Sequence, residues 1–336
     1  MISQPSGSVP RAAPWWRRAI LGAAALVVLL GAAILIERWM EDRDAARLTA
    51  SESFARLGAA RVRYLMQGEG RTGPTVVLLN GLVASLEQWE RLQALVATQH
   101  PVLAYDRAGL GFSRGSAAHD GEQQAGELAD LLAALRIEGP LVVVGFSSSA
   151  SIARLFAARH PDRVTGLVLL DPYLPEFEVH IAGRPGPFRD YARPMVTGAA
   201  KALFGIRRLS VARAERLGTA GHSGTELRVA AALVSFRHSW AAFRELLTVQ
   251  ETARQVLQIS DAELPPLIVL APSNPDGGSN AKESVIRTLV ARSRHGALRY
   301  LPPGEHGHVL DAPAPSRATA DAIDEVADPD RASHLH

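Results

Sequence analysis

The chain has 336 residues, of which 47% are hydrophobic and 21% charged, so it is long and apolar enough for one large or two ordinary globular domains. Its formal net charge is only +2, and no basic cluster is interleaved with aromatic residues, so we expect no nucleic acid partner. The lack of cysteine excludes disulfides, thiolate metal sites and a cysteine nucleophile.

The first predicted element is an uncharged apolar run from Ala19 to Ile36. A helix over this run is about 27 Å long, close to the roughly 30 Å of a membrane's hydrocarbon core. Trp15 and Trp16 precede it, where an interfacial aromatic belt would lie. A cleaved signal peptide would need a small-x-small site where Glu37–Trp39 stands, and a buried core helix is the other alternative. We therefore expect an uncleaved, single-pass membrane anchor.

Basic residues flank this run on both sides: Arg11, Arg17 and Arg18 before it, and Arg38, Arg43 and Arg47 after it. The first group favours a cytoplasmic N-terminus, and an anchor with a short basic head usually exports the domain behind it. We expect a cytoplasmic segment over residues 1–18, the anchor over 19–36, a solvated helical stem over 37–58, and the globular part on the extracytoplasmic side.

Strand and helix patterns alternate after the stem. An edge strand is predicted at Arg61–Met66. Apolar runs predict further strands at Thr75–Leu79, Val102–Asp106, Leu141–Val144, Val164–Leu170, Pro266–Ala271 and Leu298–Leu301. Helices are predicted over Gly121–Leu135 and after the capping-box sequence Ser85–Gln88, with Leu86, Trp89, Leu92 and Val96 on one face. Together these patterns indicate an α/β fold, with a mostly parallel sheet covered by helices on both faces.

The alternation stops between residues 172 and 265, where helical patterns such as Leu227–Val249 replace strand patterns. An insertion between two core strands predicts a helical cap over the active-site end, in preference to an extension of the core. We expect its aromatic stripe, Phe236, Trp240 and Phe243, to pack within the cap rather than to form a substrate cage. The predicted division is a core over residues 59–171 and 266–326, a cap over 172–265 and a tail over 327–336.

Polar residues stand at or just after the ends of the predicted strands, where ligands bind on such sheets: Asn80, Asp106, Ser147, Asp171, Asp276 and His306. The sequence Gly145–Ser149 joins a buried strand to an Ala-rich helix by a sharp turn. Such a turn projects its central residue, Ser147, outward from a strained backbone. The turn also places the Ser148 N–H at a helix N-terminus, where it could hold an anionic intermediate.

Four stretches in this order and spacing resemble the α/β-hydrolase fold family: Thr75–Gly81, Ala104–Ser113, Val144–Ser149 and Glu305–Pro313. The resemblance covers about residues 61–326. It implies Ser147 as the nucleophile, followed along the chain by an acid and a histidine base. His306 is the expected base, with His308 as its rival. The backbone N–H groups of Leu82 and Ser148 are the expected oxyanion hole.

The acid has two candidates. Asp276 lies just past the strand at Pro266–Ala271, close to the family's usual place, although the chain has Asn274 where relatives put an aspartate before a proline. A turn role would also explain Asp276. Asp171 ends an earlier strand, where some relatives have the acid. We favour Asp276, with Asp171 as the alternative acid.

Two further residues depart from the family's pattern. Asn80 stands in place of a common histidine, and Ser149 in place of the second glycine of the serine turn. The serine nucleophile itself argues against haloalkane dehalogenases and epoxide hydrolases, which on this fold use an aspartate at that position.

The resemblance implies a hydrolase without a cofactor or metal, and the sequence has no cluster with metal-ligand spacing. We expect a carboxylic ester hydrolase that cleaves small-molecule substrates with apolar acyl groups through an acyl-enzyme. The alternatives are carbon–carbon bond hydrolysis, a cofactor-free peroxidase-like activity on the same residues, and a catalytically silent anchored domain that only binds. The oligomeric state is left open.

Overall fold

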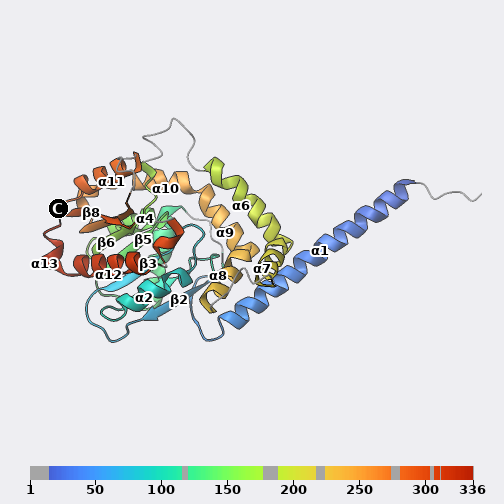
Figure 1. Ribbon diagram of the computed structural model, residues 1–336, viewed down its shortest axis with the longest axis horizontal. Coiled ribbons are helices and arrows are strands. Elements are labelled where there is room, and N and C mark those ends of the chain that lie inside the picture. The colour runs from blue at the N-terminus through green and yellow to red at the C-terminus, as the bar shows by residue number, and fades with distance from the viewer. Residues whose placement is uncertain are drawn as a thin grey trace, which may run out of the picture.

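The computed structural model describes residues 15–115, 120–176, 188–216, 224–273, 281–302, 306–310 and 312–335. Within these residues, eight strands form one sheet, with the strand order β1-β2-β4-β3-β5-β6-β7-β8 (Figure 1). The strands are β1 (Ser53–Leu57), β2 (Ala60–Gln67), β3 (Thr75–Leu79), β4 (Val102–Tyr105), β5 (Leu141–Phe146), β6 (Val164–Leu170), β7 (Leu267–Pro272) and β8 (Gly296–Leu301). Only the β1–β2 and β2–β4 pairs are antiparallel, so the predicted mostly parallel sheet is confirmed.

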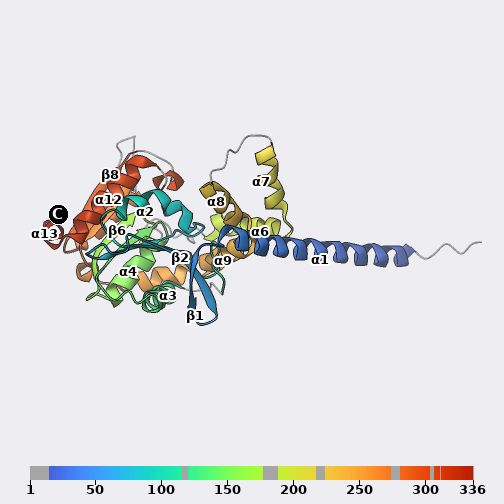
Figure 2. The same ribbon diagram turned by 90° about the horizontal axis from the view of Figure 1, so that it is seen from below.

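Helices cover both faces of the sheet, and Figure 2 shows the two layers on opposite sides of it. The layer on one face contains α3 (Gly121–Ala134), α4 (Ser149–Arg159), α10 (Val249–Val256) and α11 (Ala281–Arg292). The layer on the other contains η1 (Leu86–Trp89), α2 (Glu90–Val96) and α12 (Pro313–Ala327).

The inner strands β3, β4, β5 and β7 are almost entirely apolar because successive side chains point to opposite faces and both faces are buried. In β3, Val77 and Leu79 join the core under α3 and α4. Val76 and Leu78 join the core under α2 and α12. The predicted apolar face of the η1–α2 segment is buried as expected, with Trp89 fully enclosed.

The N-terminal border of the sheet differs from the prediction. Strand β1 lies within the segment expected to be stem, and it makes β2 an internal strand instead of the edge. The hairpin between them turns through Gly58, whose φ is +56°. Strand β1 was missed because only Ala55 in it is buried, so it has no apolar run to recognise.

The segment expected to be a tail also packs on the core. Helix α13 (Pro329–Ala332) follows α12 after a single residue, and Ala332 and Leu335 are both buried. Leu335 belongs to the core on the α12 side of the sheet.

The described residues between β6 and η2 (Asp261–Glu263) contain helices and no strand. They are α6 (Phe188–Leu203), α7 (Ile206–Arg216), α8 (Gly224–Val234), α9 (Phe236–Leu247) and α10. The helical pattern expected over Leu227–Val249 is confirmed, and it is divided among α8, α9 and the start of α10 by interruptions at Ser235 and Thr248. Ser235 is an N-cap that accepts the backbone N–H of His238 at 3.3 Å, and a capping serine starts a new helix.

The aromatic stripe of α9 packs within the cap as expected, with ring centroids 6.1 Å apart for Phe236 and Trp240 and 5.5 Å apart for Trp240 and Phe243. Trp240 is half exposed, whereas Ala241 and Ala242 are buried. Helix α9 packs on α6, where Ala199 and Ala202 are buried. Small side chains there let the two helices approach closely.

Helix α1 (Trp15–Leu48) contains the whole predicted apolar run and projects from the body (Figures 1 and 2). It is long and apolar enough to cross a membrane, and its apolar part is not buried by the protein. The stem was expected to be solvated, and this is wrong for two of its residues, since Glu37 and Glu41 are 3% and 7% exposed. Both contact the cap.

The packing of α12 on β6 generates a prediction at Gly166. An added Cβ there would lie 2.6 Å from the Val326 Cβ and 2.9 Å from its carbonyl oxygen. Gly166→Ala should therefore lower the free energy of unfolding by about 1–3 kcal/mol, the usual cost of overpacking. Urea unfolding of the detergent-solubilised chain measures this.

Gly126→Ala in α3 is the matched control, because an added Cβ there meets nothing within 4 Å. Because alanine has a higher helix propensity than glycine, this substitution should raise the free energy of unfolding by up to about 1 kcal/mol. Equal stability of the two variants would contradict the packing described.

Candidate active site

Ser147 stands on the sharp turn between β5 and α4. Its φ is +54°, a conformation that costs of order 1–3 kcal/mol for a residue with a side chain. Three backbone hydrogen bonds hold it there: the Ser147 N–H donates to the Leu170 carbonyl at 3.1 Å, and the Ser147 carbonyl accepts the N–H groups of Tyr173 at 3.0 Å and Ala150 at 3.2 Å. Gly145 is required before it, since an added Cβ would lie 2.7 Å from the Ser149 carbonyl oxygen.

Asp171 reaches the same place through the register of the sheet. Phe146 of β5 is paired with Leu170 of β6, so the next residues, Ser147 and Asp171, leave neighbouring strands side by side. Asp171 also has a positive φ, +39°, and its N–H donates to the Leu270 carbonyl of β7 at 2.7 Å. The two turns therefore rest on backbone hydrogen bonds to the sheet.

His306 closes the constellation from η3 (His306–Val309), after β8. Its Nε2 lies 2.9 Å from the Ser147 Oγ, and its Nδ1 is hydrogen-bonded to the Asp171 carboxylate. Phe146 stacks on the imidazole, with ring centroids 4.8 Å apart and an interplanar angle of 22°. The ring is thus held by one contact on its face and one at each nitrogen.

Asp171 is buried and has a second partner, because the Lys282 Nζ donates to its other carboxylate oxygen. Burial alone would raise the pKa of Asp171, but the hydrogen bond with His306 and the charge of Lys282 outweigh it and hold the pKa below its ordinary value. The carboxylate is therefore ionised at neutral pH, as a group that orients an imidazolium must be.

The structure brings together three of the predicted site residues, Ser147, His306 and Asp171. Asp276 lies outside the described residues, as does the side chain of His308. Sequence reasoning did not single out Lys282 or assign Phe146 a contact with His306. Lys282 is remote in sequence and carries no motif, whereas Phe146 belongs to the serine turn and was available.

The register between β3 and β5 brings Leu82 to the site. Leu79 is paired with Gly145, and an added Cβ on Gly81 would lie 3.3 Å from the Ser147 Cβ. Within the described part of the chain, the backbone N–H groups of Leu82 and Ser148 have no hydrogen-bond acceptor. Both donors are available to a ligand.

Arg107 holds the loop that contains Leu82, which we call the oxyanion loop (residues 80–82). Its guanidinium Nη1 donates to the Asn80 carbonyl at 2.5 Å and its Nη2 to the Gly81 carbonyl at 3.2 Å. Nη1 also donates to the Ser149 Oγ at 3.0 Å. One buried cation therefore connects the oxyanion loop to the first turn of α4.

Glu245 of α9 neutralises this cation. Its carboxylate accepts from Arg107 Nε at 2.9 Å and from Nη2 at 2.8 Å, in the two-pronged geometry typical of arginine and carboxylate. Both side chains are buried. Since Glu245 belongs to the cap, this ion pair fixes the cap to the oxyanion loop.

The two departures from the family's motifs are explained by this network. The Ser149 hydroxyl donates to the Asn80 carbonyl and accepts from Arg107. The Asn80 side chain points away from the site, where it donates to the Tyr105 carbonyl at 3.0 Å and accepts the Trp89 indole N–H. Both residues hold the oxyanion loop through side-chain hydrogen bonds.

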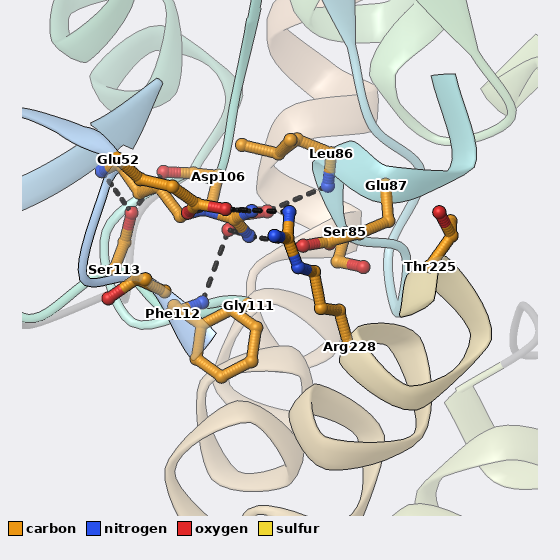
Figure 3. Close-up of polar contacts among 12 residues, drawn as sticks. Glu52, Ser85, Leu86, Glu87, Asp106, Gly111, Phe112, Ser113, Thr225 and Arg228 are labelled. Atoms are coloured by element: carbon orange, nitrogen blue, oxygen red, sulfur yellow. Dashed lines mark hydrogen bonds and ion pairs between the residues drawn. The ribbon is translucent and has the colours of Figure 1, made fainter. Parts of the chain in front are cut away.

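Asp106 belongs to a second buried network, separate from Ser147 (Figure 3). Its carboxylate accepts the N–H groups of Leu86 at 2.8 Å and Phe112 at 3.1 Å, and it pairs with Arg63 at 3.2 Å. Burial, reinforced by the charge of Glu87, raises the pKa of Asp106 to about 6. Asp106 therefore supports the loops around the site and does not reach the serine.

Glu52 extends that network to the cap. It pairs with Arg63 and accepts from Arg228 of α8 at 2.9 Å (Figure 3). Glu245 and Arg228 thus both tie the cap to the core through charged groups.

A cavity of about 1440 Å³ lies between the cap helices α6–α9 and the η1–α2 segment. Val83, which directly follows the oxyanion loop, lines one part of it. Its wall combines apolar side chains, such as Met195 and Leu233, with charged ones, such as Glu87, Lys201 and Arg207. Ser147 and His306 do not line it, so the cavity lies beside the serine site.

Within the described residues, no group of three or more histidine, aspartate or glutamate side chains is placed to hold a metal ion. The site's own groups nevertheless form a proton path. The imidazole can take the Ser147 hydroxyl proton while the carboxylate stabilises the resulting charge, and the two free N–H groups can bind an oxyanion.

Comparison with known proteins finds similar chains. A family model described as alpha/beta hydrolase fold matches residues 74–196. Among curated proteins, the uncharacterized protein YqjL of Bacillus subtilis is 37% identical over 107 residues, or 32% of this chain and 42% of its own length. Lipase LipV of Mycobacterium tuberculosis is 38% identical over 108 residues, 32% of this chain and 41% of its own length. The chain thus spans about two fifths of these relatives.

Solved structures extend the likeness over the rest of the chain. The crystal structure of a membrane phospholipase A, described as a bacterial virulence factor, covers 92% of this chain and 99% of its own, with a TM-score of 0.59 and 21% identity. At that identity, the likeness shows the fold alone.

The buried pair of Arg107 and Glu245 generates a prediction. Glu245→Gln keeps the shape but removes the charge, which leaves the guanidinium buried without its counter-ion. We expect the free energy of unfolding to fall by about 3–5 kcal/mol, measured by urea unfolding.

Glu251→Gln is the matched control, because Glu251 forms an exposed ion pair with Arg254 on α10. It should change stability by less than about 1 kcal/mol. Equal effects of the two substitutions would show that the buried pair is not a structural tie.

Proposed function

Because this chain belongs to the α/β-hydrolase fold family, we propose that it is a serine hydrolase that cleaves carboxylic esters of small molecules with apolar acyl groups. The relative named as a lipase supports this substrate class.

One observation carries the proposal. The Ser147 Oγ, the His306 imidazole and the Asp171 carboxylate form one hydrogen-bonded line, with 2.9 Å between Oγ and Nε2. A histidine within hydrogen-bond reach of a serine on a strained turn, with a buried carboxylate behind it, is the arrangement that makes a hydroxyl nucleophilic. We assign the acid to Asp171 on this contact.

The acylation step is built on these contacts. Ser147 Oγ forms a bond to the ester carbonyl carbon as its proton passes to His306 Nε2, and the carbonyl oxygen becomes an oxyanion held by the N–H groups of Leu82 and Ser148. When this intermediate collapses, the bond to the alcohol oxygen breaks and the alcohol takes the proton from Nε2. An acyl-serine remains.

Deacylation repeats the path with water. His306 Nε2 takes a proton from the water as its oxygen attacks the acyl carbon, and the second oxyanion collapses to release the carboxylic acid. The proton on Nε2 returns to Ser147 Oγ. Throughout both steps, Asp171 holds the imidazole in the tautomer with its proton on Nδ1.

We also propose that the apolar part of α1, residues 19–36, is a single-pass membrane anchor with the hydrolase body on the extracytoplasmic side. Support comes from its length and its exposure outside the folded body. The arginines before it, Arg17 and Arg18, favour this orientation.

The nucleophile is tested with Ser147→Ala. Purified full-length chain in detergent should hydrolyse short and medium acyl p-nitrophenyl esters, and removal of the hydroxyl should lower kcat by at least about 10³-fold. A fluorophosphonate probe should label the unsubstituted chain and not Ser147→Ala. Ser333→Ala, at an exposed serine of the C-terminal region, is the matched control and should keep both properties.

Two outcomes would contradict the assignment of Ser147 as the nucleophile. Equal hydrolysis by Ser147→Ala would place the activity elsewhere. Absence of both hydrolysis and labelling in a folded, unsubstituted chain would favour a catalytically silent binding domain.

The acid is tested by two parallel substitutions. Asp171→Asn should lower kcat by about 10²–10⁴-fold, because the amide cannot stabilise the imidazolium and favours the wrong tautomer. Asp276→Asn should leave kcat within a few-fold of the unsubstituted value. Thermal unfolding checks that both variants are folded, and the reverse pattern would move the acid to Asp276.

A further inference from the structure

The part of α1 that lies beyond its apolar run has a continuous acidic face. Glu37, Glu41 and Asp44 are spaced at i, i+4 and i+7, so they lie along one side of the helix. Glu37 and Glu41 are nearly fully buried, although each is a carboxylate on a helix that otherwise projects from the body. Burial of charge at two successive turns needs matching partners.

The partner of Glu37 and Asp44 is one residue of the cap, Arg208 of α7. Its guanidinium donates to Glu37 at 2.9 and 3.0 Å and also to Asp44. The turn before α7 fits closely as well, since an added Cβ on Gly205 would lie 2.9 Å from a Glu37 carboxylate oxygen. The start of α7 is therefore fixed against α1.

Glu41 is held by the start of α9. Its carboxylate accepts the Phe236 N–H and pairs with Arg237 at 3.4 Å. Asp42 pairs with the same arginine and, at 2.7 Å, with Arg114 of the core. Helix α7, helix α9 and the core therefore all contact the same turns of α1.

The position of these contacts along α1 sets the distance of the cap from the membrane that α1 is proposed to cross. Glu37 directly follows Ile36, the last residue of the apolar run, and one residue of helix is about 1.5 Å. The Arg208–Glu37 pair therefore lies at the border of the hydrocarbon core. Trp39 lies at the same level with Arg43 stacked 5.4 Å from its ring, a pairing typical of a membrane interface.

The cap exposes apolar side chains at this level. Ile206 and Leu209 of α7 are 47% and 67% exposed, and their i, i+3 spacing puts them on one face. Lys201, in the last turn of α6, is also exposed and precedes Ile206 closely in the sequence. Both views show α6 and α7 on the side of the body that faces the N-terminal half of α1 (Figures 1 and 2).

From these observations we propose that the corner of the cap formed by Lys201, Ile206 and Leu209 lies on the membrane surface, with Ile206 and Leu209 among the lipid headgroups. Apolar side chains with adjacent cations are the composition that binds at a lipid interface. The proposal rests on the proposed anchoring by α1, and adds that the cap is a second membrane contact, set at a fixed height by the Arg208 ion pairs.

The test uses single-cysteine variants of the full chain in lipid nanodiscs, which is simple because the chain has no cysteine of its own. A bimane fluorophore is placed at residue 209, 39 or 257 through Leu209→Cys, Trp39→Cys or Leu257→Cys. Leu257 is the matched comparison, an exposed leucine (42%) just after α10 and away from α1. Quenching by lipids with a nitroxide near the headgroup reports contact with the membrane interface.

We expect bimane at residue 209 to be quenched several-fold more than at residue 257, and to a degree comparable with residue 39. Quenching at 39 without quenching at 209 would overturn the second membrane contact and leave the anchor intact. Absence of quenching at 39 would overturn the anchor itself, and this inference with it.

The role of the ion pairs is tested by adding Arg208→Gln to the Leu209→Cys variant. Release of Glu37 and Asp44 should reduce quenching at 209, whereas quenching at 39 should not change. Arg299→Gln, which breaks the ion pair with Glu325 between β8 and α12, is the control and should change neither. Unchanged quenching at 209 in Arg208→Gln would show that these pairs do not set the height of the cap.

Discussion

The burial of one guanidinium constrains most of the active-site end of this protein. Arg107 has five N–H donors, and all five have an acceptor: two on Glu245, one on Ser149, and the carbonyl groups of Asn80 and Gly81. A buried cation is tolerated only when it is neutralised and fully hydrogen-bonded. The cap, the oxyanion loop and the start of α4 must therefore assemble together, because each supplies part of that requirement.

This requirement explains why Ser149 and Asn80 stand where the family's motifs have other residues. A second glycine in the serine turn could not supply the hydroxyl that Ser149 places between Arg107 and the Asn80 carbonyl. The Asn80 side chain is fixed by Trp89 and Tyr105, so the oxyanion loop is held from both sides. In this chain, the buried Arg107 and its partners therefore hold the oxyanion loop in place.

Much of the fold can be predicted from local pattern, and the exceptions have identifiable causes. Apolar strands such as β3 and β6 and the face of Trp89 were predictable because burial on both sides leaves a strong signal. Strand β1 could not be predicted in this way, since only Ala55 in it is buried. The position of Asp171 beside Ser147 depends on the pairing of Phe146 with Leu170 across two strands, which no local pattern contains. The ion pair of Arg107 and Glu245 joins residues 138 apart in sequence and was equally invisible.

The positions of Ser147 and Asp171 have a mechanical consequence. Both residues directly follow the last paired residues of neighbouring parallel strands, whose spacing is about 4.8 Å, so the sheet holds the bases of the two turns. The imidazole, in contrast, stands on a four-residue 3-10 turn outside the sheet. Local opening of that turn requires less free energy than global unfolding. On heating, the proton path should therefore break at the imidazole while the sheet is still intact, and cooling should restore it.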